Sequence, residues 1–355
     1  MINLNKIIGK NPYSLNKLQK KNLIKKNLLI LDKHHYKNCK NYKKLINSFN
    51  LNYKNKYSNI EDFQMLPVKI FKKFDLLSVN KKKIVKELIS SGTSGQKVSK
   101  IFLDKENSKN QMKVLTKIVE NKIGNQRLPM LIIDKKPSIT DRSFFNAKSA
   151  AIFGFSLFGK NYCYLINEKN EIDYKLLNTF LKKFDNKKFL IFGFTSFIYK
   201  YLIIKMKNNL KINFNNGILI HGGGWKKLEY RKISGDLFKK KLEKKLNLKK
   251  IFNYYGMVEQ TGSIFIECNH GYFHTTIFSD IFIRDHNFVI QKFNKKGLIQ
   301  LISLIPSSYP GHNIITEDIG EIKGDGDCKC GLNGKYFLVH GRAKEAEIRG
   351  CSDVG

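Results

Sequence analysis

The stretch Ile218-Leu219-Ile220-His221-Gly222-Gly223-Gly224-Trp225 joins a short apolar run directly to three glycines. An apolar run of this length, bounded by turn residues, is typical of a strand buried in a parallel sheet. The glycines would then lie at the carboxyl end of the strand, where open α/β sheets bind their ligands. The stretch therefore predicts a ligand-binding turn in an α/β protein, and an ordinary glycine turn is the alternative.

Similar apolar runs recur on both sides of this stretch: Ile101 to Leu103, Leu128 to Ile133, Phe189 to Phe192 and Ile251 to Tyr255. Amphipathic segments lie between them, and we expect Asp104 and Thr195 to act as N-caps of two such helices. Strand, helix and strand in alternation indicate a largely parallel sheet.

The two ends of the chain have a different texture. Apolar residues recur at helical spacing within residues 1–85, as in Ile24, Leu28 and Leu31. Beyond Gly262, short strands with Gly and Asn turns are expected at Ile264 to Glu267, Phe288 to Gln291, Leu298 to Leu304 and Tyr336 to His340. We therefore expect one domain over residues 1–341, with a helical segment (1–85), an α/β core (86–261) and a smaller β-rich unit (262–341).

A run of small residues, Ser90-Ser91-Gly92-Thr93-Ser94-Gly95, precedes the strand expected at Ile101. Backbone amides approach a phosphate closely only where side chains are small, and hydroxyl groups add further donors. No Gly-Lys-Ser/Thr sequence ends the run, so it is not a Walker A loop. It predicts a phosphate-binding loop, with a flexible turn as the alternative.

A third candidate, Tyr254-Tyr255-Gly256-Met257-Val258-Glu259-Gln260-Thr261-Gly262, follows the strand expected from Ile251. An aromatic ring, a carboxylate and flanking glycines suit a nucleotide base and Mg²⁺. Taken alone, Glu259 and the later Asp318 could equally be solvated turn acids.

In this order, these segments resemble the adenylate-forming superfamily of acyl-CoA synthetases, and within it the LuxE-type acyl-protein synthetases. The resemblance covers nearly the whole chain and rests on SSGTSG from Ser90, HGGGWK from His221, YGMVEQTG from Tyr255, TED from Thr316 and GRAKEAEIRGC from Gly341. It extends to PYSL at Pro12, RLPMLIID at Arg127 and SYPGHNIITEDIGEI at Ser308.

The resemblance implies an ATP-dependent ligase that works in two steps. A carboxylic acid, for which we expect a fatty acid, attacks the α-phosphate of ATP to give an acyl-adenylate and pyrophosphate, and a thiol then takes the acyl group. The first step joins two anions, so the site must supply amide donors and a divalent cation where charge develops.

The resemblance also implies roles for individual residues. Asp318 would accept hydrogen bonds from the ribose hydroxyls, and Arg342 would bind ribose or phosphate. Glu259 would act in catalysis by binding Mg²⁺. The phosphate loop would consist of Ser91, Gly92, Thr93, Ser94 and Gly95. Gly222, Gly223 and Gly224 would form the wall against the adenine, and Tyr255, followed by Gly256, would stack on it.

Two features depart from the superfamily pattern. Lys97-Val98 stands where many members have Pro-Lys, so no loop lysine is assigned to the phosphates. The superfamily generally carries a mobile C-terminal domain with a catalytic lysine beyond the GR motif, whereas 13 residues follow Arg342. We expect residues 342–355 to be the start of a truncated C-terminal segment, with the lid domain short or absent.

Cys328-Lys329-Cys330-Gly331 and the earlier Cys268 and His274 suggest a metal site in the β-rich unit. Two thiolates from one turn, with a thiolate and an imidazole from another, would make a closed tetrahedral zinc site. His274 is preferred over His270 because a strand-like Tyr-Phe-His segment could orient it. Inert turn cysteines are the alternative.

Cys351 is the candidate acyl acceptor. It lies in Arg-Gly-Cys-Ser-Asp near the C-terminus, and positive charge favours the nucleophilic thiolate. The resemblance implies the same role, since LuxE-type proteins carry the acceptor cysteine near this end. Its alternative is a small residue in a tail.

The composition leaves one alternative of another class. Lys and Arg number 65 against 29 acids, a net charge of +36, which would suit a nucleic-acid or membrane-surface binder. However, only six of the basic residues are Arg, and Lys is spread evenly among Asn, Ile, Phe and Tyr, which share A/T-rich codons. We therefore expect no nucleic-acid partner, no membrane span and a cytoplasmic enzyme.

The sequence also leaves the acyl acceptor open. Coenzyme A, a carrier protein or an amine in surface-polysaccharide or lipid metabolism could replace the protein thiol. An acyl-accepting reductase or a carrier protein is the expected partner.

Overall fold

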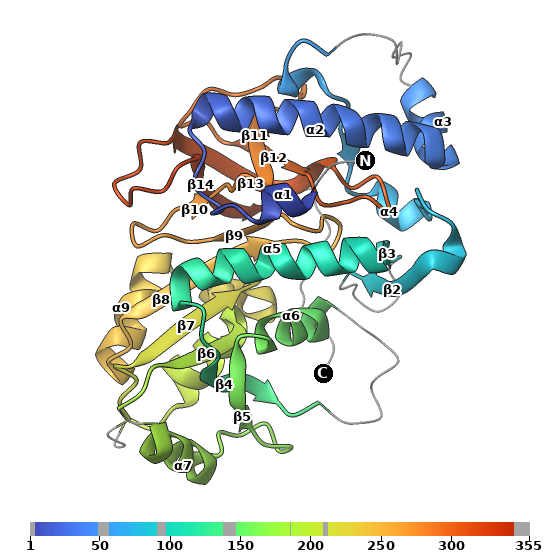
Figure 1. Ribbon diagram of the computed structural model, residues 1–355. Coiled ribbons are helices and arrows are strands. Elements are labelled where there is room, and N and C mark those ends of the chain that lie inside the picture. The colour runs from blue at the N-terminus through green and yellow to red at the C-terminus, as the bar shows by residue number, and fades with distance from the viewer. Residues whose placement is uncertain are drawn as a thin grey trace. The chain divides into compact units, whose positions relative to one another are not determined.

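The computed structural model describes residues 4–48, 57–90, 97–137, 147–184, 186–208 and 212–343. These residues form two compact units. The first combines the described parts of 4–119 and 256–343, and the second contains those of 120–255 (Figure 1). The helical segment at the start of the chain and the β-rich segment at its end therefore share one unit. The expected single domain over residues 1–341 stays a prediction.

A parallel sheet forms the centre of the second unit. Its strands run in the order β5-β4-β6-β7-β8, and every neighbouring pair is parallel: β4 (Leu128–Lys135), β5 (Gly159–Ile166), β6 (Phe189–Phe194), β7 (Gly217–Gly222) and β8 (Lys250–Gly256). Every residue of β6 and β7 is buried, as expected for strands covered on both faces. The structure thus confirms the mixed α/β class with a parallel sheet core.

Helices follow the strands of this sheet: α6 (Ala147–Ser156), α7 (Tyr174–Phe184), α8 (Thr195–Phe197), the π-helix η4 (Ile198–Lys205), the 3₁₀ helix η5 (Lys226–Arg231) and α9 (Gly235–Leu246). Helix α7 shows how they attach, because Leu177, Phe180 and Phe184 recur on one face and are buried in the apolar core of the unit.

The first unit is built around an antiparallel sheet in the order β10-β14-β13-β12-β11. Its strands are β10 (Phe273–His274), β11 (Ser279–Arg284), β12 (Gly297–Ser303), β13 (Asn313–Asp325) and β14 (Lys335–Arg342), with β1 (Leu66–Pro67) parallel to β13. β9 (Ile264–Ile266) precedes β10 in the chain and is not a strand of this sheet. The expected smaller β-rich part is therefore present.

Helices α1 (Leu4–Ile8), α2 (Lys17–Asn38), α3 (Lys40–Ser48) and α4 (Ile70–Lys73) belong to the same unit, and Figure 1 shows α2 as its longest blue helix. Asn16 starts α2 with a capping box, in which its side chain accepts from Gln19 N at 2.9 Å. Ile24, Leu28 and Leu31 form the buried face of α2. Among the described residues, no helix is long and apolar enough to cross a bilayer.

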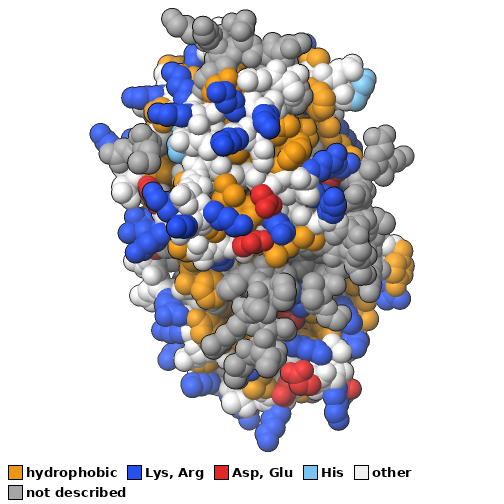
Figure 2. All heavy atoms as spheres, turned by 90° about the vertical axis from the view of Figure 1, so that its right-hand side faces the viewer, with side chains coloured by type: hydrophobic (Ala, Val, Ile, Leu, Met, Phe, Trp, Pro, Cys, Tyr) orange, Lys and Arg blue, Asp and Glu red, His pale blue; other side chains and the backbone are white. Residues whose placement is uncertain are grey.

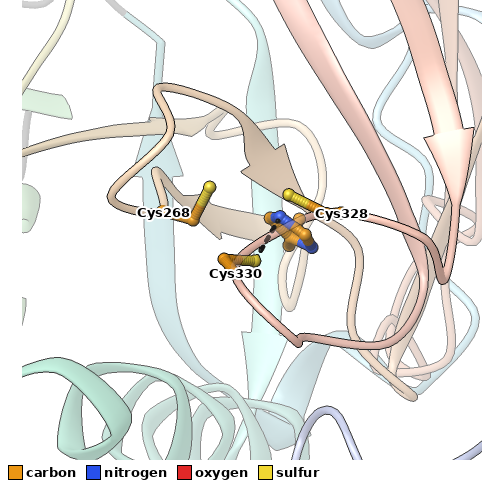
Figure 3. A group of neighbouring side chains, drawn as sticks. Cys268, Cys328 and Cys330 are labelled. Carbon is orange, nitrogen blue, oxygen red and sulfur yellow. Dashed lines mark hydrogen bonds between the residues drawn. The ribbon is translucent and has the colours of Figure 1, made fainter.

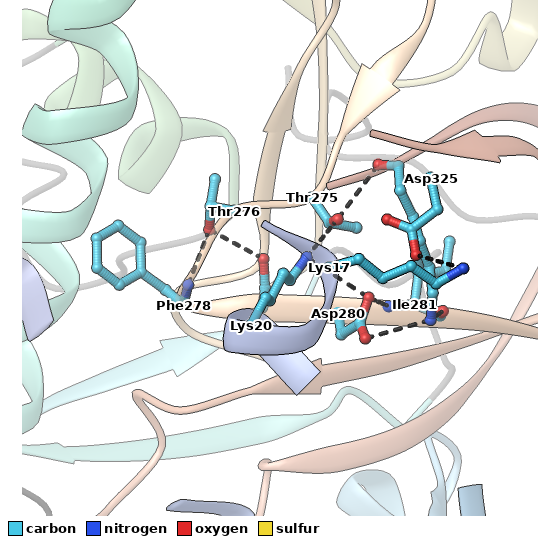
Figure 4. Close-up of polar contacts among 10 residues, drawn as sticks. Lys17, Lys20, Thr275, Thr276, Phe278, Asp280, Ile281 and Asp325 are labelled. Carbon is cyan, nitrogen blue, oxygen red and sulfur yellow. Dashed lines mark hydrogen bonds and ion pairs between the residues drawn. The ribbon is translucent and has the colours of Figure 1, made fainter. Parts of the chain in front are cut away.

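A buried charged group attaches the start of α2 to the sheet (Figure 4). Lys20 Nζ donates to Thr275 Oγ1 at 2.6 Å and lies 3.6 Å from Asp280 Oδ1. Lys335 Nζ lies 3.2 Å from the other oxygen of Asp280. Burial alone would raise the pKa of Asp280, but the two ammonium groups lower it below its usual value.

Ile101 to Leu103 forms the expected buried strand, β3 (Lys100–Asp104), and Asp104 caps the following helix α5 (Lys105–Ile123) as predicted. This strand pairs antiparallel with β2 (Ile84–Ile89), outside the parallel sheet. Two expectations about local structure were wrong. Phe288 to Gln291 forms only an isolated bridge, because Phe288 adopts a φ of 62°. The N-cap of α8 is Phe194, since the Thr195 hydroxyl is used elsewhere.

Candidate active site

The β2–β3 hairpin holds both ends of the Ser/Gly loop. Ser90 N donates to Ser99 O at 3.0 Å, and Ser99 N donates to Ser90 Oγ at 2.9 Å. The predicted phosphate-binding residues between these ends lie outside the described residues: Ser91, Gly92, Thr93, Ser94 and Gly95. The structure therefore fixes the base of this loop in the first unit.

Glu259 belongs to the same unit and is only 5% exposed. The residues after it hold its turn in place: Gln260 Nε2 donates to Gly311 O at 2.8 Å, and Thr261 N donates to Tyr309 Oη at 2.9 Å. A Cβ added at Gly311 would lie 3.0 Å from the Glu259 carbonyl oxygen. The Tyr-Pro-Gly segment from Tyr309 is thus packed directly against the Glu259 turn, so the backbone of this acid is held firmly.

The charge state of Glu259 depends on its neighbours. Burial raises the pKa of its carboxyl above the usual value, and the Ser99 hydroxyl opposes that rise. The negative charge of Asp318 raises the pKa further, while Arg342 lowers it. A buried carboxylate near a second acid is a position where a divalent cation would favour the ionised form.

Asp318 and Arg342 face each other across the β13–β14 pair, as Cα partners in its register. Arg342 Nε lies 4.0 Å from Asp318 Oδ1, and Arg342 Nη2 donates to the carboxylate of Glu317. Lys69 Nζ lies 2.9 Å from the other oxygen of Glu317. Sequence reasoning missed Glu317 and Lys69, although Glu317 is the middle residue of the Thr-Glu-Asp segment.

The three glycines predicted to contact adenine differ in their surroundings within the second unit. A Cβ on Gly222 would lie 2.7 Å from two ring atoms of Tyr254, so this glycine is required by internal packing. Gly223 has a φ of +77°, which disfavours any side chain. A Cβ on Gly224 would meet nothing within 4 Å. Of the three, Gly224 is the one at which packing within the unit does not require glycine.

Thr195 and His221 position this glycine turn. Thr195 Oγ1 donates to Gly222 O at 3.1 Å and lies 2.9 Å from His221 Nδ1, which acts as a donor to it. Burial, together with Lys239, lowers the pKa of His221 to about 3, so its imidazole is neutral. The sequence pattern does not identify this contact, because it predicts Thr195 as a helix N-cap.

The remaining nucleotide candidates lie at the end of β8. Tyr255 is half-buried on this strand of the second unit, and Gly256 follows it at the start of the second segment of the first unit. Glu259, Asp318 and Arg342 also belong to that segment.

The predicted metal ligands come together in the first unit. The ligand atoms of Cys268, His274, Cys328 and Cys330 all lie within 4.8 Å of one another (Figure 3). Cys330 Sγ lies 3.3 Å from His274 Nε2. His270 is exposed and is not part of the group. Cys351 lies outside the described residues.

Basic side chains are scattered over the face of the molecule in Figure 2, among apolar and uncharged ones. Among the described residues of that face, they form no continuous stripe.

Comparisons with known proteins agree with the arrangement of these segments. The LuxE acyl-protein synthetase family matches residues 3–355, while no curated protein gives a sequence match. An open conformation of 2-hydroxyisobutyryl-CoA ligase, in complex with 2-HIB-AMP and CoA, has a similar fold, with a TM-score of 0.73 at 12% identity over 94% of this chain and 77% of the other. The same ligase in the thioesterification state gives a TM-score of 0.71 at 12% identity, with 94% and 70% covered. The chain therefore belongs to the LuxE acyl-protein synthetase family, and its fold is that of adenylate-forming ligases.

Proposed function

We propose that this ligase activates a fatty acid as its acyl-adenylate and passes the acyl group to a protein thiol, that of Cys351. The observation that carries the first half is the surroundings of Glu259. Its buried carboxyl interacts with Ser99, at the base of the Ser/Gly loop, and with the Asp318–Arg342 pair on β13 and β14. Groups on three segments far apart in sequence thus shift the pKa of one acid.

Each group has a task that suits its chemistry. The loop from Ser91 to Gly95 offers amide and hydroxyl donors to the phosphates, and Arg342 supplies a planar cation for ribose or phosphate oxygens. Asp318 accepts hydrogen bonds from the ribose hydroxyls. Gly224 and Tyr255 contact the adenine, with Gly222, Gly223 and Gly256 shaping the backbone around them.

Glu259 is the residue that would hold Mg²⁺. When bound, this cation neutralises charge on the phosphates as the carboxylate approaches the α-phosphorus. The donor set fits, since the Glu259 carboxyl is buried and a second carboxylate, that of Asp318, acts on it.

The second half of the reaction depends on Cys351. Its thiolate attacks the acyl carbonyl of the adenylate, the bond from that carbon to the AMP oxygen breaks, and AMP leaves with the electron pair. Arg349, two residues before Cys351, favours the thiolate. The thioester could then be passed to a reductase or a carrier protein.

Pyrophosphate exchange tests the first half alone. We expect exchange of label between pyrophosphate and ATP to depend on an added carboxylic acid and to be strongest with fatty acids in a panel of chain lengths. Exchange with short or aromatic acids only would refute the fatty-acid proposal. Salt-sensitive DNA binding without any exchange would favour the nucleic-acid alternative.

A labelled fatty acid tests the acceptor. Incubation with ATP and Mg²⁺ should leave label on the protein that neutral hydroxylamine removes, because hydroxylamine cleaves a thioester and spares an amide. Cys351→Ser should abolish this label and retain pyrophosphate exchange. Cys163→Ser is the matched control, since Cys163 is a buried thiol on β5. Label that survives Cys351→Ser would transfer the acceptor role to coenzyme A, a carrier or an amine.

A further inference from the structure

Two four-residue turns in the first unit have the same geometry. Cys268-Asn269-His270-Gly271 closes with Gly271 N donating to Cys268 O at 3.0 Å, and Cys328-Lys329-Cys330-Gly331 closes with Gly331 N donating to Cys328 O at 2.9 Å. The two glycines have φ angles of +78° and +77°. Glycine is favoured at both positions because this backbone conformation is left-handed.

Each turn also directs a backbone N–H at the sulfur of its first cysteine. His270 N donates to Cys268 Sγ at 3.4 Å, and the Cys330 N–H makes the same contact with the Cys328 thiol. Such donors stabilise negative charge on sulfur. The two turns are therefore alike in backbone shape and in the N–H group that faces their first sulfur.

The nitrogen ligand comes from a separate strand. His274 is fully buried on β10, where it is the register partner of Tyr336 on β14, and the two rings stack with centroids 5.7 Å apart. Thr275, the next residue, donates its N–H to Lys335 O at 2.9 Å. The imidazole is thus held by the sheet before any metal arrives.

From this arrangement we propose that Cys268, His274, Cys328 and Cys330 bind one structural Zn²⁺. Three thiolates and one imidazole are a donor set that selects zinc over Mg²⁺ or Ca²⁺. A zinc tetrahedron places its ligand atoms about 3.4–3.8 Å apart. Since the four atoms already lie within 4.8 Å, side-chain shifts of about 1 Å would complete it.

The site is structural rather than catalytic because four protein ligands fill the coordination sphere. It joins residues 268–274 to residues 328–330, and it lies against the segment that precedes α2. The Tyr13 ring stands edge-on to His274 at 6.4 Å, and Asn333 Nδ2 donates to Tyr13 O at 3.1 Å. Zinc would therefore fix the same edge of the unit that the Lys20–Asp280–Lys335 group fixes by charge.

Metal analysis of the full chain, purified without chelator, is the direct test. We expect about one zinc per chain. Cys328→Ser combined with Cys330→Ser should lower the content at least tenfold. Cys163→Ser should leave it unchanged, because Cys163 is equally a buried thiol but lies in the second unit.

The choice of histidine has its own matched pair. His274→Ala should reduce zinc binding, and His274→Cys should restore it by supplying a fourth thiolate. His270→Ala should bind zinc like the unchanged chain. Loss of zinc in His270→Ala alone would overturn the ligand assignment.

Cobalt gives a readout that does not depend on a variant folding. Protein reconstituted with Co²⁺ should show a thiolate-to-cobalt charge-transfer band and the visible bands of a tetrahedral ion. Absence of zinc together with absence of these bands would overturn the proposal, as would a disulfide among Cys268, Cys328 and Cys330 in freshly purified protein.

Discussion

Gly222 and Gly224 are adjacent to the same Gly223, yet replacing each by alanine should have different effects on stability. A Cβ on Gly222 would lie 2.7 Å from Tyr254 Cδ1 and Cζ, against the 3.4 Å at which ordinary contact begins. The ring would have to move by close to 1 Å. Phe155 restrains it at a centroid distance of 4.9 Å.

The cost follows from two opposing terms. Overpacking of this kind destabilises by about 1–3 kcal/mol, and the reduced freedom of the unfolded chain returns about 0.4–1 kcal/mol. We therefore expect Gly222→Ala to lower the free energy of unfolding by about 1–2 kcal/mol. Gly224→Ala should leave it unchanged or raise it slightly, since nothing lies within 4 Å of the added carbon.

The only tryptophan of the chain makes this measurable. Trp225 is buried in the second unit against Phe238 and Tyr199, so its fluorescence during urea unfolding reports on that unit. In a Tyr254→Leu background, Gly222→Ala should lower the free energy of unfolding much less, which corresponds to a coupling energy between the two positions of about 1 kcal/mol or more. Equal stability of Gly222→Ala and the unchanged chain would refute the packing argument. Gly224→Ala should instead raise the KM for ATP, because its proposed partner is the adenine.

Two further substitutions test buried acids. Glu259→Gln should lower acid-dependent pyrophosphate exchange by about 100-fold or more while the fold persists. Because burial raises the pKa of Glu259, its ionisation lowers the free energy of unfolding as pH rises through that pKa. The glutamine variant should lose this pH dependence in urea titrations at several pH values. Unchanged exchange would remove Glu259 from the metal role. Asp280→Asn should destabilise by about 3–5 kcal/mol, because Lys20 and Lys335 lose their buried partner. Because the pKa of Asp280 is lowered, the stability difference between the unchanged chain and Asp280→Asn should be fully present above the usual carboxyl pKa and should disappear as pH falls through the lowered pKa. A stability difference that stays constant in acid would contradict the ion-pair explanation.

Continuous burial made the central strands easy to predict from sequence. β6 and β7 are buried at every position and contain the apolar runs Phe189 to Phe192 and Ile218 to Ile220. β5 was missed because its first half is mostly exposed at the edge of the sheet, so Gly159 to Tyr162 carries no apolar run. Apolar patterning reports burial, and an edge strand has less of it.

The candidate site shows a similar limit. Spacing and side-chain chemistry selected His274 over His270, and the structure groups His274 with the thiols. The same reasoning could not distinguish Gly222 from Gly224, because the Tyr254 ring that decides between them comes from a different strand. Nor could it find Lys69 beside Glu317, since that contact joins residues separated by most of the chain.

The return of the chain to its first unit has a consequence for synthesis on the ribosome. The parallel strands β4 to β8 lie between residues 128 and 256, so they all emerge before most of the antiparallel sheet has been translated. Helix α2 must wait for β11 before Lys20 can meet Asp280, and Lys335, the first residue of β14, arrives later still. The sheet of the second unit can thus fold cotranslationally, while the N-terminal helices expose apolar faces that a chaperone would have to protect until β14 appears.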